Sequence, residues 1–84
     1  MLTPYMTLDV LTPTGALLSG EQVSAVFLPG ALGQFEVLRG HAPIISSLSR
    51  GEIIYRSGDG EKSLSVSSGF AIVADDHIQA CIEQ

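Results

Sequence analysis

The 84-residue sequence contains a single cysteine, no tryptophan and few charged residues, and each shortage excludes a class of protein. Because Cys81 has no second cysteine to pair with, the chain can form neither an internal disulfide nor a zinc site built from several cysteines. A lone thiol fits a reducing compartment. The length predicts one domain, residues 1–84, and excludes the large enzymatic folds.

Positive charge is also scarce, with four lysines and arginines against nine acidic residues and a net charge of -5. The four cations are scattered along the chain and form no basic stripe, so we expect no binding to nucleic acid. Charged residues make up only 15% of the chain, against about 25% in an average soluble domain. We therefore expect one broad apolar surface to remain exposed for a partner.

Long hydrophobic runs are missing as well. The longest uncharged stretches, residues 22–34 and 40–49, are broken by proline or glycine and fall short of the roughly 20 apolar residues of a membrane span. We expect no direct insertion into a membrane.

Apolar residues alternate with a period of two along most of the chain, which predicts β-strands. Turn signals separate the runs, and Asp59-Gly60 is the strongest of them. The pair Gly20-Glu21 is expected to interrupt the second strand, and residues 44–49 are too short and too poor in helix formers for a helix. The predicted strands cover residues 6–11, 16–19, 23–28, 34–37, 52–56, 63–67, 70–74 and 78–82.

This pattern predicts an all-β fold, a sandwich of two antiparallel, roughly five-stranded sheets around one core. The residues in the expected inward phase of their strands are Val10, Phe27, Val37, Val66, Phe70 and Ile72.

Candidate chemical groups are sparse. The segment Asp75-Asp76-His77 is the nearest approach to a metal or general-base cluster, but its place between two alternating runs favours a polar turn. His41 has no second ligand at a suitable spacing, and Cys81 lies in a strand where it packs or faces outward. We therefore assign no catalytic, metal-binding or cofactor-binding residue.

Two further features of the sequence do not support an enzyme. The serines lack a G-x-S-x-G elbow, and the glycines of residues 30–33 precede a strand without a P-loop lysine. The residues alone indicate an interaction domain, and a free-standing β-sandwich that binds a protein or a small ligand remains the alternative function.

Several short motifs follow one another along nearly the whole chain: Ser19-Gly20-Glu21, residues 26–30, Gly33-Gln34-Phe35, Gly40-His41-Ala42-Pro43 and Ser68-Gly69-Phe70. In this order they resemble the N-terminal domain of the epsilon subunit of bacterial F-type ATP synthase. The G-H-A-P stretch is the most specific of them.

The resemblance implies a sandwich of two five-stranded sheets in the central stalk of the synthase. It implies the gamma subunit, the c subunits of the rotor ring and the catalytic head as partners, and coupling of ion flow to ATP synthesis without catalysis or a cofactor. The implied location is peripheral, on the cytoplasmic side of the bacterial inner membrane.

The resemblance also implies two contact segments. Gly33, Gln34 and Phe35 correspond to a loop that meets the rotor ring, with Gln34 where members often carry glutamate. The second segment corresponds to the junction of gamma and the ring, with an arginine in place of the usual proline; its residues are Arg39, Gly40, His41, Ala42 and Pro43.

Most members of this family continue into a helical hairpin that can inhibit ATP hydrolysis. Because this sequence begins with methionine, shows no tag and ends at Gln84, we expect a natural short form without that brake.

Overall fold

The computed structural model describes residues 5–84, so the initial methionine lies outside it. The described part consists of nine strands and turns. No helix in it is long and apolar enough to cross a membrane. The strands are β1 (Met6–Thr12), β2 (Gly15–Val23), β3 (Ala25–Gly30), β4 (Gly33–Val37), β5 (Ile44–Leu48), β6 (Gly51–Ser57), β7 (Gly60–Val66), β8 (Ser68–Ala74) and β9 (His77–Glu83).

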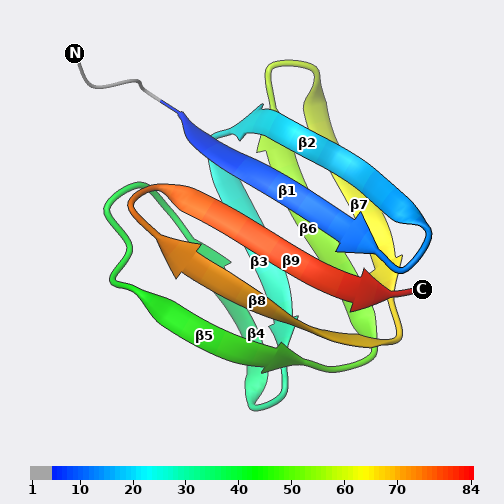
Figure 1. The fold of residues 1–84 in the computed structure, drawn as a ribbon. Helices are drawn as coiled ribbons and strands as arrows, with labels where there is room; N and C mark the ends of the chain where they lie inside the picture. The colour runs from blue at the N-terminus through cyan, green and yellow to red at the C-terminus, as the bar shows by residue number, and fades with distance from the viewer. Residues whose placement is uncertain (1–4) are drawn as a thin grey trace.

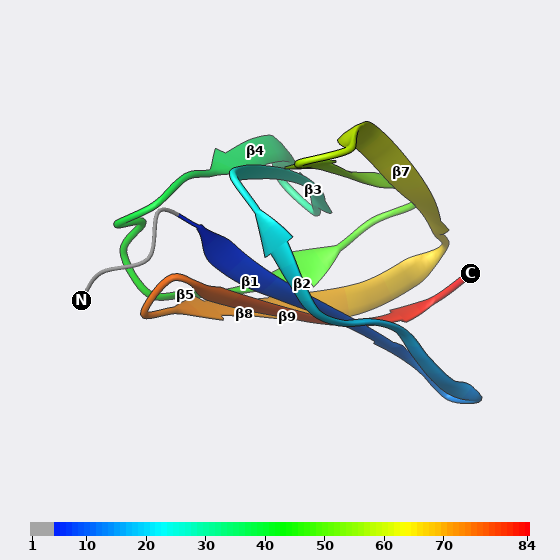
Figure 2. The same ribbon diagram turned by 90° about the horizontal axis from the view of Figure 1, so that it is seen from above.

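The strands form two layers packed face to face (Figures 1 and 2). One layer has five strands in the order β2-β1-β9-β8-β5, and the other has four in the order β4-β3-β6-β7. Figure 1 looks onto the five-stranded layer, and Figure 2 shows the two layers from above. The predicted all-β sandwich is confirmed.

Hydrogen bonds join the two layers along one side, so the nine strands form one curled sheet. The joint is the pairing of Gly30 in β3 with Leu48 in β5. Two backbone hydrogen bonds flank it, from Ser49 N–H to Pro29 C=O at 2.8 Å and from Ala31 N–H to Ser47 C=O at 3.0 Å. An added Cβ at Gly30 would lie 2.8 Å from the Gly33 carbonyl oxygen and 2.9 Å from the Phe35 ring, so the close packing at this joint requires a residue without a side chain.

One strand pairing differs from the antiparallel prediction. The terminal strands β1 and β9 are neighbours and run parallel, with Thr7 opposite His77 and Leu11 opposite Cys81. Parallel partners cannot be joined by a tight hairpin, and here nearly the whole chain lies between them. This pairing places the two terminal strands of the chain side by side inside the five-stranded layer.

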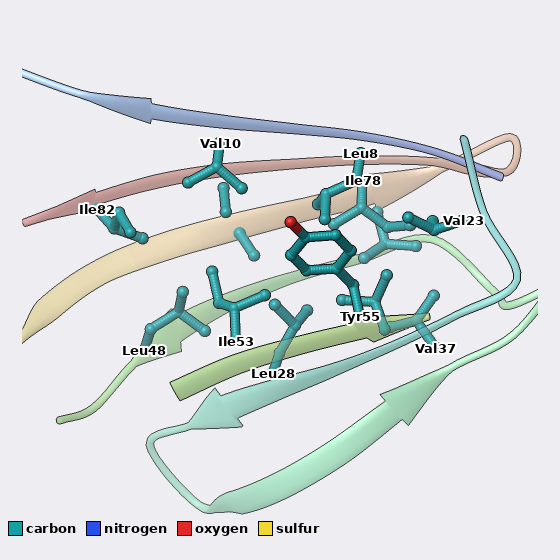
Figure 3. Close-up of a cluster of buried hydrophobic side chains, with 14 of the residues drawn as sticks. Leu8, Val10, Val23, Leu28, Val37, Leu48, Ile53, Tyr55, Ile78 and Ile82 are labelled. Atoms are coloured by element: carbon teal, nitrogen blue, oxygen red, sulfur yellow. The ribbon is translucent and has the colours of Figure 1, made fainter. Parts of the chain in front are cut away.

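The core lies between the layers (Figure 3). Leu8, Val10 and Ile78 of the five-stranded layer face Leu28 and Ile53 of the other, and all five are fully buried. Each such side chain stabilises the fold by about 1.5 to 3 kcal/mol relative to exposure. Among the described residues, no polar or charged residue is buried.

Half of the predicted core is confirmed and half is wrong. Val10, Val37 and Val66 are buried as expected. Phe27 is only half-buried, while Phe70 and Ile72 are exposed, because their strands present the opposite phase to the core. Because side chains alternate between faces, a choice of phase that is wrong by one residue moves the whole set to the outside.

The reason lies in strands whose two phases are both apolar. In β8, Ala71 and Val73 point into the core, so the larger Phe70 and Ile72 point outward. In β3 the inward residues include Val26 and Leu28. Periodicity alone does not separate the faces of such strands.

Two further predictions are corrected by the strand pairing. β2 continues past Gly20 and Glu21, because Gly20 adopts a φ of 65° and forms a bulge opposite Asp9, where the register shifts between Leu8 and Val10. Residues 44–48, which were assigned no strand, form β5 and pair with β8.

Candidate functional site

The outer surface of the five-stranded layer carries a continuous apolar band. Its residues are cross-strand neighbours, since Ile45 lies opposite Ile72, Phe70 opposite Cys81, and Cys81 opposite Leu11. Ile45 is 75% exposed, Phe70 44% and Ile72 37%, so the band is open to solvent. We call these five residues the apolar face.

The opposite outer surface, on the four-stranded layer, has a different character. Arg56 forms an ion pair with Glu61 at 3.3 Å and lies over the Phe27 ring, 5.9 Å from its centre. Glu36 lies opposite Phe27, and Ile54 lies opposite Phe27 and Ser63. Charged groups thus surround the apolar side chains here, whereas the apolar face has no such cover among the contacts of residues 5–84.

A shallow groove of about 470 Å³ runs along one end of the apolar face. It is lined by Leu11 and Pro13 at the β1–β2 turn, by Phe70 in β8 and by Cys81 in β9. Glu83 adds one carboxylate at its edge. The groove forms an open recess at this end of the apolar face.

A polar cluster borders the apolar face at the centre of the layer. Asp9 Oδ1 accepts a hydrogen bond of 2.6 Å from Gly20 N–H, and His77 Nε2 donates to Asp9 Oδ2 at 2.8 Å. The Gly20 N–H, with a smaller effect from His77, holds the pKa of the Asp9 carboxyl below its usual value of 3.8. The cluster links β2, β1 and β9.

Replacement of Asp9 should make the domain less stable in a pH-dependent way. A carboxyl with a lowered pKa in the folded state stabilises the fold above its unfolded pKa, and this contribution is lost as the pH falls through the folded value. We expect Asp9→Ala to cost about 1 kcal/mol at pH 7, since the pair with His77 is partly screened by solvent. Urea unfolding should show this cost shrinking from about pH 4 downward.

The control for Asp9→Ala is Glu36→Ala, which removes an exposed carboxylate from β4. It should change the free energy of unfolding little, both at pH 7 and below about pH 4. Equal losses for the two variants, or a cost of Asp9→Ala that does not depend on pH, would contradict the role assigned to the Asp9 cluster.

The segment predicted to meet the rotor ring lies at the β3–β4 hairpin. Gly33 has a φ of 130°, Gln34 is exposed on the outer side of β4, and Phe35 is half-buried against the core. At the tip, the side chain of Leu32 is completely exposed. The tip therefore offers an apolar group that the sequence analysis did not single out.

The second predicted segment, residues 39–43, connects β4 to β5 and so crosses from one layer to the other. Gly40 has a φ of 78°, and His41 N–H donates to Leu38 C=O at 3.1 Å. His41 Nδ1 lies 2.7 Å from the Ala42 carbonyl oxygen, which can only accept, so Nδ1 carries the hydrogen. We call this segment the 39–43 loop.

The structure does not bring the two predicted segments together. They flank β4, with the hairpin tip before it and the 39–43 loop after it (Figure 1). A five-residue strand spans roughly 15 Å. The two segments are therefore separate contact sites rather than one cluster.

The 39–43 loop instead contacts the β8–β9 turn. Asp75 and Asp76 both have positive φ, 52° and 60°, and form the polar turn predicted for this segment. Asp76 Oδ1 accepts a hydrogen bond of 2.7 Å from Gly40 N–H. Its short side chain tolerates this backbone geometry, which most residues avoid. Composition indicated the turn but not its hydrogen bond to a residue 36 positions away.

Residues 5–84 contain no group of three histidine, cysteine, aspartate or glutamate side chains placed to hold a metal ion. His41 and His77 lie in different surroundings, and His77 pairs with Asp9. Within residues 5–84, the features suited to binding a partner are the apolar face, the β3–β4 hairpin and the 39–43 loop. The fold and surface together define an all-β interaction domain.

Comparison with known proteins identifies the family. The chain belongs to the family of the ATP synthase delta/epsilon chain β-sandwich domain, whose sequence model matches residues 5–84.

Individual relatives agree with the family assignment. The chain is 40% identical over 78 residues to ATP synthase epsilon chain 2 of Syntrophotalea carbinolica, covering 93% of this chain and 56% of the relative. It is 43% identical over 77 residues to the ATP synthase epsilon chain of Magnetococcus marinus, covering 92% and 56%. The chain thus spans somewhat more than half the length of these curated relatives.

Solved structures confirm the fold. A chain of the Euglena gracilis mitochondrial ATP synthase, in the OSCP/F1/c-ring assembly, superposes with a TM-score of 0.90 at 22% identity, covering all of this chain and 54% of the other. A chain of the Tetrahymena thermophila mitochondrial ATP synthase central stalk and c-ring gives 0.77 at 14% identity, covering 94% and 63%.

Proposed function

We propose that this chain is a non-catalytic subunit of the central stalk of an F-type ATP synthase. In this role it joins the gamma subunit to the membrane rotor ring and couples ion flow to ATP synthesis. The apolar face is the single observation that carries the proposal, because it is an exposed apolar surface on a domain of the delta/epsilon chain family. In this proposal the chain is a peripheral component on the cytoplasmic side of a bacterial inner membrane.

The apolar face is the surface that binds gamma in this proposal. Interface centres are depleted in charge and enriched in aromatic and aliphatic side chains. Phe70 supplies the aromatic anchor, with Ile45 and Ile72 beside it in adjacent strands. The Asp9–His77 pair forms part of the polar rim. The charged outer surface of the four-stranded layer remains in water.

The two loops provide the remaining contacts. The β3–β4 hairpin, with Gly33, Gln34 and Phe35, meets the polar loops of the ring, and the exposed Leu32 adds an apolar contact at its tip. Since Gln34 is uncharged, this contact rests on hydrogen bonding and packing rather than on an ion pair. The 39–43 loop contacts the junction of gamma and the ring through Arg39 and His41.

Co-elution with the gamma subunit of the same organism tests the proposal. We expect the two chains to leave a size-exclusion column together as a one-to-one complex and to release heat on titration. The catalytic head should hydrolyse ATP without this chain. Separate elution at concentrations well above micromolar, together with no detectable heat, would overturn the assignment to the central stalk.

A further inference from the structure

The β8–β9 turn holds the 39–43 loop by Gly40, the second residue of the loop. The loop is almost entirely at the surface, with Arg39, Gly40, Ala42 and Pro43 exposed and His41 half-buried. The hydrogen bond from Gly40 N–H to Asp76 Oδ1, at 2.7 Å, joins it to a strand end in the five-stranded layer. In Figure 1 the loop and this turn lie at the same end of the sandwich.

Asp76 is itself held in place by the backbone. Its carbonyl oxygen accepts a hydrogen bond of 3.0 Å from Thr7 N–H at the start of β1. The next residue, His77, is the first of β9 and pairs with Asp9 of β1. The carboxylate of Asp76 therefore projects from a turn that is fixed on two sides, and it can restrain the exposed 39–43 loop.

We infer that Asp76 is a positioning residue for partner binding: it fixes Gly40 so that the flanking Arg39 and His41 are presented in one geometry. The inference rests on the proposed function, in which these two residues contact the stalk. A carboxylate accepting from a backbone N–H is a charge-assisted hydrogen bond, stronger than a neutral one. A loop fixed before binding loses less conformational entropy when the partner arrives.

Three substitutions separate this role from a general effect of the turn. Asp76→Gly removes the carboxylate, and glycine adopts a φ of 60° without strain. Asp76→Asn keeps an oxygen acceptor on a residue that also tolerates this conformation. Asp75→Gly is the matched control, because Asp75 is exposed in the same turn with a φ of 52°.

The first readout is hydrogen exchange of the Gly40 amide in the isolated chain, measured by NMR. Asp76→Gly should accelerate this exchange, whereas Asp76→Asn and Asp75→Gly should leave it close to the wild-type rate. Unchanged Gly40 exchange in Asp76→Gly would overturn the inference, since the hydrogen bond would then restrain nothing.

The second readout is the affinity for gamma, measured by calorimetry with folded variants. Asp76→Gly should weaken binding about tenfold, and Asp76→Asn should restore most of the affinity. Faster Gly40 exchange in Asp76→Gly with wild-type affinity would overturn the positioning role while leaving the proposed function intact. If the wild-type chain itself failed to bind gamma, the proposed function and this role in binding would both be overturned.

Discussion

Gly69→Ala should unfold the domain or bring it close to unfolding. Gly69 in β8 has a φ of 147°, and an added Cβ would meet the carbonyl oxygen of Cys81 and lie 2.8 Å from the Cα of Ile82. Both obstacles belong to the backbone of β9, so no side-chain rotation relieves them. Strain at positive φ and overpacking cost about 1 to 3 kcal/mol each.

The expected loss is therefore about 3 to 5 kcal/mol, a large part of the roughly 5 to 10 kcal/mol that stabilises a small domain. Thermal or urea unfolding followed by circular dichroism measures it. Gly58→Ala is the control, because no atom lies within 4 Å of a Cβ added in the β6–β7 turn. It should change stability by less than about 0.5 kcal/mol. Similar effects of the two substitutions would refute the packing assigned to Gly69.

Ile72→Lys should weaken binding to gamma about 100-fold while leaving the domain folded. Ile72 lies near the middle of the apolar face, 37% exposed, so a lysine there can extend its ammonium into water in the free chain. In the complex the charge would be buried without a partner. We expect affinity to fall about 100-fold, or about 3 kcal/mol.

The same substitution on the opposite surface supplies the matched control. Ile54 occupies an outward position of β6 in the four-stranded layer, beside Arg56 and Glu61. Ile54→Lys should bind gamma within about twofold of the wild type, since this surface stays in water. Calorimetric titration of both variants decides between the two faces. A greater loss of affinity from Ile54→Lys than from Ile72→Lys would contradict the placement of the interface on the five-stranded layer.

The fold class could be predicted from the sequence because period-two alternation and turn residues report on local backbone structure. The turn at Asp59-Gly60 followed from this pattern. The pattern did not predict which residues of β8 point into the core. Both phases of this strand are apolar, with Phe70 and Ile72 in one and Ala71 and Val73 in the other. Only packing against the other layer selects the small Ala71 and Val73 for the core.

The location of the apolar face could not be predicted from the sequence, because both phases of β8 are apolar. Phe70 and Ile72 were assigned to the core, so the exposed surface was expected from composition without a location. The parallel pairing of β1 with β9, which brings Leu11 beside Cys81, joins residues 70 positions apart. The hydrogen bonds of Asp9 and Asp76 are also long-range, and local patterns carry no signal for them.

The reaction rate of Cys81 with a thiol reagent, with and without gamma, tests the central claim most directly. Cys81 is the only cysteine of the chain and lies half-buried in the apolar face, between Phe70 and Leu11. Mass spectrometry of the Cys81 peptide separates its labelling from that of any cysteine in gamma. If gamma docks on the apolar face, labelling should slow to the rate at which the complex dissociates. Labelling at the rate of the free chain, in a complex shown to be intact, would contradict the account.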